Sequence, residues 1–167
     1  YYCDAEKKGY SGVAIFTRQK PDKVSCSLGI DLADREGRYI QVDFANLSVA
    51  SIYLPSGSSG DERQADKIKF LEEFYPILQN KHDQEQDFVI CGDINIVHKD
   101  IDIKNWKSNQ KRSGCLPEER AWLDRVFAQG WVDAFRAVDS RADQYTWWSN
   151  RGRAWDNNVG WRIDYQW

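Results

Sequence analysis

The chain has 167 residues, of which 41% are hydrophobic and 29% are charged, and its formal net charge is −3. This composition is that of an ordinary globular protein, and the length suggests one domain. No apolar run approaches the roughly 20 residues that a membrane-spanning helix needs. The negative net charge argues against a broadly basic surface for nucleic acid, although it leaves a local basic face open.

The first half of the chain predicts strands that pair in hairpins. An apolar run at 12–18 reads as a buried strand, and 24–28 is its expected partner. Residues 38–44 alternate between polar and apolar, and 47–53 follow after a two-residue turn, which is typical of a second hairpin.

Two helices and further strands are predicted in the rest of the chain. A loop at 55–61 ends on Asp61, which is expected to cap a helix over 62–81. The apolar run 87–91 reads as a strand, and Pro117 begins a second helix. The expected apolar face of the first helix is Ile68, Leu71, Phe74, Tyr75 and Leu78, and that of the second is Trp122, Leu123, Val126 and Phe127. Further strands are expected at 145–148 and 159–166. This mixture predicts an α/β (α+β) fold without repeating βαβ units.

Cysteine and methionine usage adds two expectations. The four cysteines form no C-x-x-C pair: Cys3, Cys26, Cys91 and Cys115. Structural zinc is therefore not expected, and free thiols in a reducing cytoplasm are predicted. Methionine is absent and 162–167 alternates without a turn signal, so we expect a single domain, 1–167, that is truncated at both ends.

Nucleophilic catalysis finds little support in the sequence. There are only two histidines, His82 and His98, and neither a G-x-S-x-G elbow nor a phosphate-binding G-x-x-x-x-G-K-[ST] loop occurs. Polar residues at predicted strand ends remain as candidates for chemistry.

Asp93 and Asn95 follow the strand that ends near residue 91, and alternation puts both on one face. Tyr53 ends another strand, and Arg162 and Asp164 share a face of the last one. A carboxylate can bind Mg²⁺ or accept a proton from water, an amide can bind metal, and a phenol can donate to a phosphate. The structural alternatives are an Asx turn for Asp93, a core or rim aromatic residue for Tyr53, and an ion pair for Arg162 and Asp164. A metal site would also need at least one more acidic ligand.

Two loops carry basic and aromatic residues suited to a polyanion. Residues 98–112 hold five Lys/Arg against two Asp, with Trp106 among them, and 147–155 hold three tryptophans and two arginines. Basic groups neutralise phosphates and aromatic faces stack on bases. A solvated charge run and the edge of a tryptophan-rich core are the alternatives.

Five stretches in order resemble a known family: 53–57 (YLPSG), 92–96 (GDINI), 116–124 (LPEERAWLD), 145–148 (YTWW) and 160–165 (GWRIDY). Together they are similar to bacterial exonuclease III, of the exonuclease–endonuclease–phosphatase superfamily. The resemblance implies a four-layered α/β sandwich of the DNase I-like type, with its terminal strands missing from this stretch.

The resemblance also implies a function. It predicts Mg²⁺-dependent hydrolysis of DNA phosphodiesters, with Mn²⁺ as a substitute metal: 3′→5′ exonuclease action and abasic-site incision in base excision repair. The expected partner is double-stranded DNA with abasic sites or 3′ ends, bound by a cytoplasmic monomer without a membrane partner.

Residue roles follow from matching motifs. Asp93 would activate water, Asn95 would stabilise the transition state or touch metal, Tyr53 would contact the scissile phosphate, and Asp164 would orient a histidine. Asp93 and Asn95 are the expected metal ligands. Among the expected DNA-binding residues, Trp147 and Arg151 match the family's DNA-facing loop. Lys104 and Lys107 are expected from the basic run 98–112.

This sequence departs from the family pattern in three places. The family's early Asn and metal-binding Glu would lie upstream of Tyr1, and its Ser-Asp-His motif beyond Trp167, so this stretch alone is expected to be a poor catalyst. Ile94 replaces a Trp that is frequent in the Gly-Asp-Trp-Asn motif, at a position that points away from the site.

Two other functions stay open. One is a catalytically inactive, nuclease-like regulator of the catabolite repression control type, which acts in an RNA-bound complex. The other is a phosphatase of the same superfamily. The presence of both Asp93 and Asn95 favours the nuclease over the regulator, and the basic, tryptophan-rich loops favour it over the phosphatase.

Overall fold

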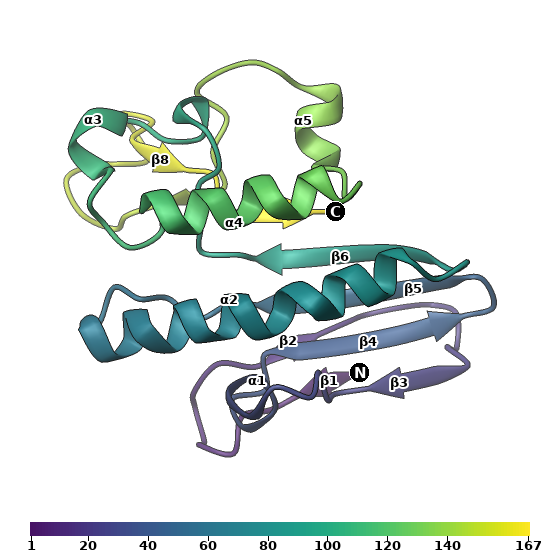
Figure 1. The fold of residues 1–167 in the computed structure, drawn as a ribbon. Helices are drawn as coiled ribbons and strands as arrows, with labels where there is room; N and C mark the ends of the chain where they lie inside the picture. Colours follow the sequence, from purple (N-terminus) through teal and green to yellow (C-terminus); the bar gives the residue numbers. More distant parts are fainter.

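A five-stranded mixed sheet organises the chain, and the computed structural model describes all residues 1–167 (Figure 1). Along the sheet, the strand order is β3 (Lys23–Ser25), β4 (Tyr39–Phe44), β5 (Leu47–Tyr53), β6 (Asp87–Asp93) and β9 (Asp164–Gln166). Only β5 and β6 are parallel; the other neighbours pair antiparallel.

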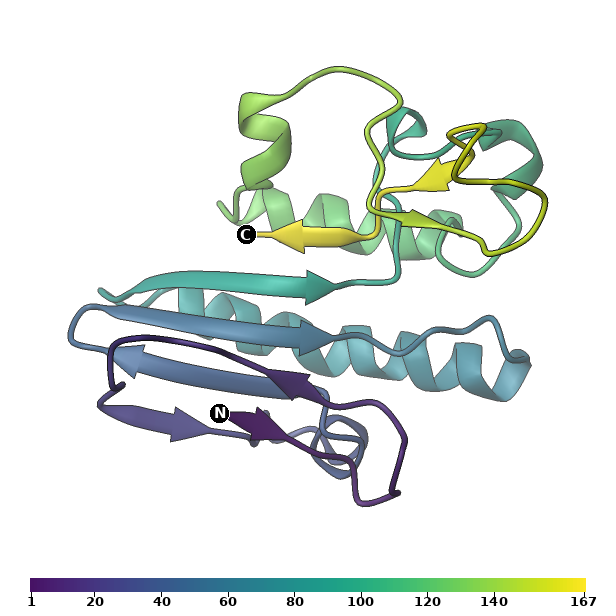
Figure 2. The same ribbon diagram turned by 180° about the vertical axis from the view of Figure 1, so that it is seen from behind.

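Two long helices, α2 (Asp61–His82) and α4 (Pro117–Ala128), cover one face of the sheet (Figure 1). A ribbon of β1 (Tyr2–Cys3) and β2 (Val13–Ala14) lies on the opposite face, beside β4 (Figure 2). The remaining elements are short: α1 (Asp31–Arg35), the 3₁₀ helix η1 (Asp100–Asp102), α3 (Trp106–Asn109), α5 (Ala134–Val138) and the paired strands β7 (Trp147–Trp148) and β8 (Gly160–Trp161). No helix in the structure combines the length and the apolar composition that a membrane span requires.

The main core lies between the sheet and the two long helices. Ile52 and Ile90 come from the strands, Phe74 from α2 and Trp122 from α4, and each is at least 98% buried. Trp122 also donates its indole N–H to the carbonyl of Leu71, at 2.8 Å, so its polar atom is satisfied inside the core. Burying each side chain of this size contributes about 1.5–3 kcal/mol, which fixes both helices on the sheet.

The parallel pair β5 and β6 determines where polar strand ends meet. Helix α2 is the crossover between them, so both strands run in one direction and Tyr53 lies opposite Asp93. Gly92 allows this close pairing, because a Cβ there would collide with the carbonyl of Ile52 and its φ is +151°. Two polar side chains, those of Tyr53 and Asp93, thus emerge at one edge of the sheet.

Much of the predicted secondary structure is confirmed. The α/β class, the hairpin of β4 and β5, and the helices α2 and α4 all occur, with Pro117 as the first residue of α4. The apolar-alternation rule succeeds for these elements because each is long and packs on one core face.

Three details differ from the prediction. The strand predicted at 12–18 is only Val13–Ala14 and pairs with β1. The strand predicted at 24–28 is β3, Lys23–Ser25, and it pairs with β4 rather than with the first strand. Gly60, not Asp61, is the N-cap of α2. The segment 159–166 is divided between β8 and β9 because Arg162 turns into the interior.

The prediction of four free thiols is wrong for two of them. Cys3 and Cys26 form a disulfide whose Cα atoms are 5.8 Å apart, while Cys91 and Cys115 are free. Cys3 is on the ribbon that packs on β4, and Cys26 directly follows β3, the neighbour of β4. Their proximity depends on this long-range packing, which no local cysteine spacing encodes.

Candidate functional site

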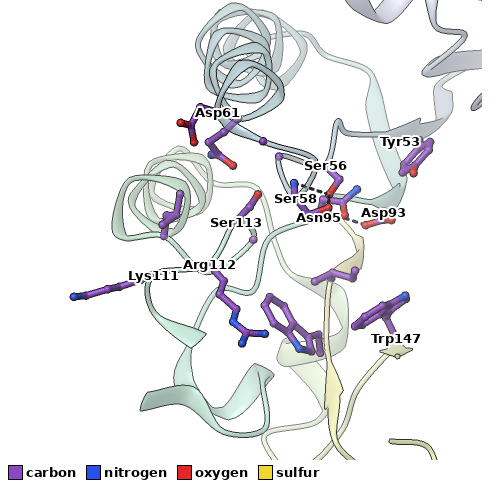
Figure 3. Close-up of a pocket in the computed structure, with 17 residues that line it drawn as sticks. Tyr53, Ser56, Ser58, Asp61, Asp93, Asn95, Lys111, Arg112, Ser113 and Trp147 are labelled. Atoms are coloured by element: carbon purple, nitrogen blue, oxygen red, sulfur yellow. Dashed lines mark hydrogen bonds between the residues drawn. The ribbon is translucent and has the colours of Figure 1, made fainter. Parts of the chain in front are cut away.

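A cleft of about 780 Å³ opens at the edge of the sheet where β5 and β6 end. Tyr53, Asp93 and Asn95 line one side of it. Arg112 and Trp147 lie across from these strand-end residues, on segments that follow α3 and α5 respectively (Figure 3).

Asp93 and Asn95 are joined in a tight turn. The backbone N–H of Asn95 donates to Asp93 Oδ1 at 2.8 Å, and φ of Asn95 is +55°. The side-chain amide of Asn95 donates to the carbonyl of Leu54, also at 2.8 Å. These bonds leave Asp93 Oδ2 and Asn95 Oδ1 as the oxygens without a protein donor. The Asx turn that was one alternative for Asp93 therefore occurs, and it lies at the edge of the cleft.

Alternation alone does not explain why Asp93 and Asn95 share the cleft. The extended backbone ends at Asp93, and the left-handed turn at Asn95 brings its side chain back beside the carboxylate. Ile94 and Ile96 are buried in the core, as expected for side chains that point away from the cleft.

The carboxyl group of Asp93 has a perturbed pKa. Burial raises it from its ordinary 3.8 to about 6, and the negative charge of Asp164 acts in the same direction. The N–H of Asn95 and the positive charges of Lys67 and Arg38 lower the pKa and limit the rise. A carboxylate with a pKa near 6 is ionised at neutral pH and is a stronger base than an ordinary one.

Asp164 lies directly opposite Asp93 in the pairing of β6 with β9. Its backbone N–H donates to Thr146 Oγ1 at 3.1 Å, which ties this strand to the loop before β7. Asp164 is partly buried and stands beside the cleft rather than among the residues that line it. Two carboxylates thus lie side by side at the strand ends.

The donor set suits a hard divalent cation in its chemistry, because Mg²⁺ prefers carboxylate and amide oxygens. Asp93 and Asn95 each direct one oxygen without a protein donor at the cleft. No group of three His, Cys, Asp or Glu side chains converges to hold a metal ion, however. Asp93 and Asn95 could therefore supply part of the ligands of a cation, and a complete site would need one more acidic ligand.

Tyr53 is held by Arg38, a residue that the sequence argument missed. The Arg38 guanidinium lies 4.6 Å from the centroid of the Tyr53 ring and donates to the Tyr53 carbonyl at 2.9 Å. Arg38 is only 3% exposed and is paired with Glu36 at 2.6 Å. Its place in an alternating strand looked ordinary, so no local signal marked it.

The residues predicted to bind DNA are dispersed. Trp147 lines the cleft and meets Trp161 edge-on, with ring centroids 6.4 Å apart. Lys104 pairs with Asp143 at 3.0 Å, away from the cleft. Lys107 and Arg151 are exposed and lie outside its lining.

Two other basic residues of the same charged run, Lys111 and Arg112, line the cleft instead. The composition of 98–112 indicated a basic surface, but it held no information about which side chains face the strand ends. That choice depends on the turn that leads from α3 into α4.

Arg162 does not form the ion pair with Asp164 that was the structural alternative for these two residues. It is 1% exposed and does not pair with Asp164, because it turns inward to Asp102 and Asp133, each at 2.7 Å. Arg136 also binds Asp102, at 2.6 Å. This buried network anchors the chain immediately before Asp164, so it supports the site from behind.

Residues 1–167 match the family described as the Endonuclease/Exonuclease/phosphatase family over their whole length. The chain belongs to this family. It is 39% identical over 166 residues to an exodeoxyribonuclease of Bacillus subtilis, covering 99% of the chain and 66% of that protein. It is 34% identical over 172 residues to exodeoxyribonuclease III of Haemophilus influenzae, covering 95% and 64%. The resemblance to exonuclease III is thereby confirmed.

The fold comparison agrees. The structure of an AP endonuclease from Archaeoglobus fulgidus matches with a TM-score of 0.87 and 28% identity, covering 99% of this chain and 65% of that one. The DNase I-like α/β fold expected from the sequence is confirmed by this match. The chain spans slightly less than two thirds of the length of each of these three relatives.

Proposed function

We propose that the protein is a Mg²⁺-dependent DNA phosphodiester hydrolase, acting as a 3′→5′ exonuclease and as an endonuclease at abasic sites in base excision repair. One observation carries the proposal: Asp93, with its raised pKa, stands beside Asn95 and Asp164 at the rim of a cleft whose far side holds Arg112 and Trp147. The named activities of the relatives support the same chemistry.

In this proposal, Asp93 accepts a proton from the attacking water through Oδ2, the oxygen that Asn95 leaves free. Asn95 directs Oδ1 into the cleft because its amide N–H is held by Leu54, which favours metal binding over donation to phosphate. A bound Mg²⁺ would neutralise charge on the phosphate. Tyr53 would donate its hydroxyl to the phosphate, and Asp164 would orient a histidine beside Asp93.

The cleft also offers groups for the DNA itself. Arg112, which lies across the cleft from the strand ends, would neutralise a phosphate, while Lys111 extends outward from the same segment (Figure 3). The exposed face of Trp147, 45% accessible, would stack on a base or sugar.

Lys104, Lys107 and Arg151 remain proposed contacts for more distant parts of the duplex, because they lie outside the cleft. The proposal treats the enzyme as a monomer. The cytoplasm stays the proposed compartment. Mn²⁺ stays the proposed substitute metal.

The test separates hydrolysis from binding in the full-length product of the gene that contains this sequence. Asp93→Ala should lower the rate of duplex hydrolysis at least about 1000-fold, and it should leave the Kd for DNA within about threefold, since the basic and aromatic groups remain. Asp87→Ala, an exposed site at the other end of β6, is the matched control and should leave both unchanged.

Retained hydrolysis in Asp93→Ala would remove this residue from the chemistry. A comparable loss of DNA binding would show that the carboxylate acts mainly in substrate affinity. A wild-type protein that binds RNA complexes and leaves DNA intact would favour the regulator instead.

A further inference from the structure

A buried ion pair behind the cleft joins α2 to α4. Lys67 and Glu119 are both 0% exposed, and Lys67 Nζ lies 2.7 Å from Glu119 Oε1. Lys67 Nζ also donates to the backbone carbonyl of Asn95 at 2.8 Å. The Lys67 ammonium group therefore holds the turn at Asn95, whose side-chain amide lines the cleft.

Glu119 is equally committed to backbone groups. Its Oε2 accepts from the N–H of Gly114 at 2.6 Å and from that of Leu116 at 3.0 Å. Its Oε1 accepts from the Gln64 side chain at 3.0 Å. Gly114 ends the segment that carries Lys111 and Arg112, so the carboxylate fixes the side of the cleft opposite the strand ends.

The two loops that border the cleft also touch each other at this point. The N–H of Val97 donates to the carbonyl of Gly114 at 2.8 Å. Gly114 has φ +89°, and a Cβ there would come within 2.9 Å of the Asn95 carbonyl. The backbones of Asn95 and Gly114 therefore lie too close together for a side chain at 114. The Lys67–Glu119 pair binds both of these backbones, Lys67 at Asn95 and Glu119 at Gly114.

A fully buried ion pair is weak support for stability, since well-packed apolar residues often replace one without loss. Its value lies in geometry: charged groups hold their hydrogen-bond partners at short, defined distances. Here the partners are the backbones of Asn95, Gly114 and Leu116, which belong to the two sides of one cleft.

We propose that Lys67 and Glu119 are positioning residues of the site: Lys67 holds Asn95 in its left-handed turn, and Glu119 holds the 111–116 segment at a fixed separation from it. The catalytic consequence rests on the proposed function, whereas the structural consequence does not. Neither residue touches the substrate, because neither is exposed to the cleft.

The test uses Lys67→Met/Glu119→Gln in the full-length protein. This double variant removes the donor to Asn95 without leaving an unpaired charge, and Gln keeps one oxygen for the backbone N–H groups. We expect kcat to fall about 10- to 100-fold with KM within about threefold, as for misplacement of a reacting group. Leu78→Ala, a fully buried α2 site, controls for lost stability and should leave kcat of the folded protein within about twofold.

Nuclear magnetic resonance gives a readout that does not depend on activity. The backbone ¹³Cα shift and the ³J(HN–Hα) coupling of Asn95 should report a left-handed conformation in the wild type and in Leu78→Ala, and should lose it in the double variant. If the double variant does not fold, Glu119→Gln alone should shift the amide signals of Gly114 and Leu116.

Unchanged Asn95 signals in the folded double variant, or unchanged Gly114 and Leu116 signals in Glu119→Gln, would overturn the inference. A wild-type protein that cleaves no DNA would refute the proposed function instead, and the resonance data would still decide the positioning role.

Discussion

Replacing Asp93 by Asn should stabilise the folded protein at neutral pH. The carboxyl group titrates near 3.8 in the unfolded chain, and in the folded protein its pKa is about 6. Between these values the unfolded state releases the proton first, so the free energy of unfolding falls as pH rises from about 4 to 6. Above pH 6 the whole cost of the buried charge is present.

The magnitude follows from the size of the shift. Each pKa unit corresponds to about 1.36 kcal/mol, so the shift of Asp93 costs at most about 3 kcal/mol at pH 8. Asn95 keeps its partner, because an Asn side chain at 93 still presents an oxygen to its N–H. For a protein of this size, about 3 kcal/mol corresponds to roughly 8 °C in Tm.

The assay is thermal unfolding followed by circular dichroism, in EDTA so that metal binding does not contribute, from pH 4 to pH 8. Asp93→Asn and the wild type should unfold together near pH 4 and separate progressively up to about pH 6–7. Asp87→Asn, at the exposed end of β6, should stay within about 0.5 kcal/mol of the wild type. A variant no more stable than the wild type at pH 8, or a gap independent of pH, would refute the reasoning.

Two further predictions concern arginines. Arg112→Ala should weaken duplex binding and lower the slope of log Kd against log salt by about one, as expected for one lost phosphate contact. The same result is predicted for Arg151→Ala, and an unchanged slope would remove the residue concerned from the interface. Arg162→Met should cost about 3–5 kcal/mol in urea unfolding, because Asp102 and Asp133 lose their buried cation; a cost below about 1 kcal/mol would contradict the structural role of the network.

The long elements of the fold could be predicted from the sequence because local apolar patterns indicate which of their faces pack in the core. Helix α2 and the hairpin of β4 and β5 each present one apolar face, and Pro117 marks where α4 begins. The short elements could not be predicted in this way. β2 and β3 are two and three residues long, and their partners are chosen by sheet edges that form only when distant segments meet.

Some residues of the candidate site could likewise be predicted from the sequence, and others could not. Tyr53 ends one predicted strand, and Asp93 and Asn95 follow another, so their placement at strand ends could be predicted. Arg38 and the Lys67–Glu119 pair could not be, because each resembles an ordinary solvent-facing residue until the tertiary structure buries it. Inward-pointing charges of this kind depend on contacts between elements far apart in the chain.

The most direct measurement uses the full-length gene product and an end-labelled duplex with one abasic site, incubated with Mg²⁺ or with EDTA. We expect a single incision beside the abasic site in Mg²⁺, none in EDTA, and none with Asp93→Ala in either condition. A folded wild-type protein that leaves the duplex intact in Mg²⁺ would contradict the proposed hydrolysis and reduce Asp93 and Asn95 to the turn that closes β6.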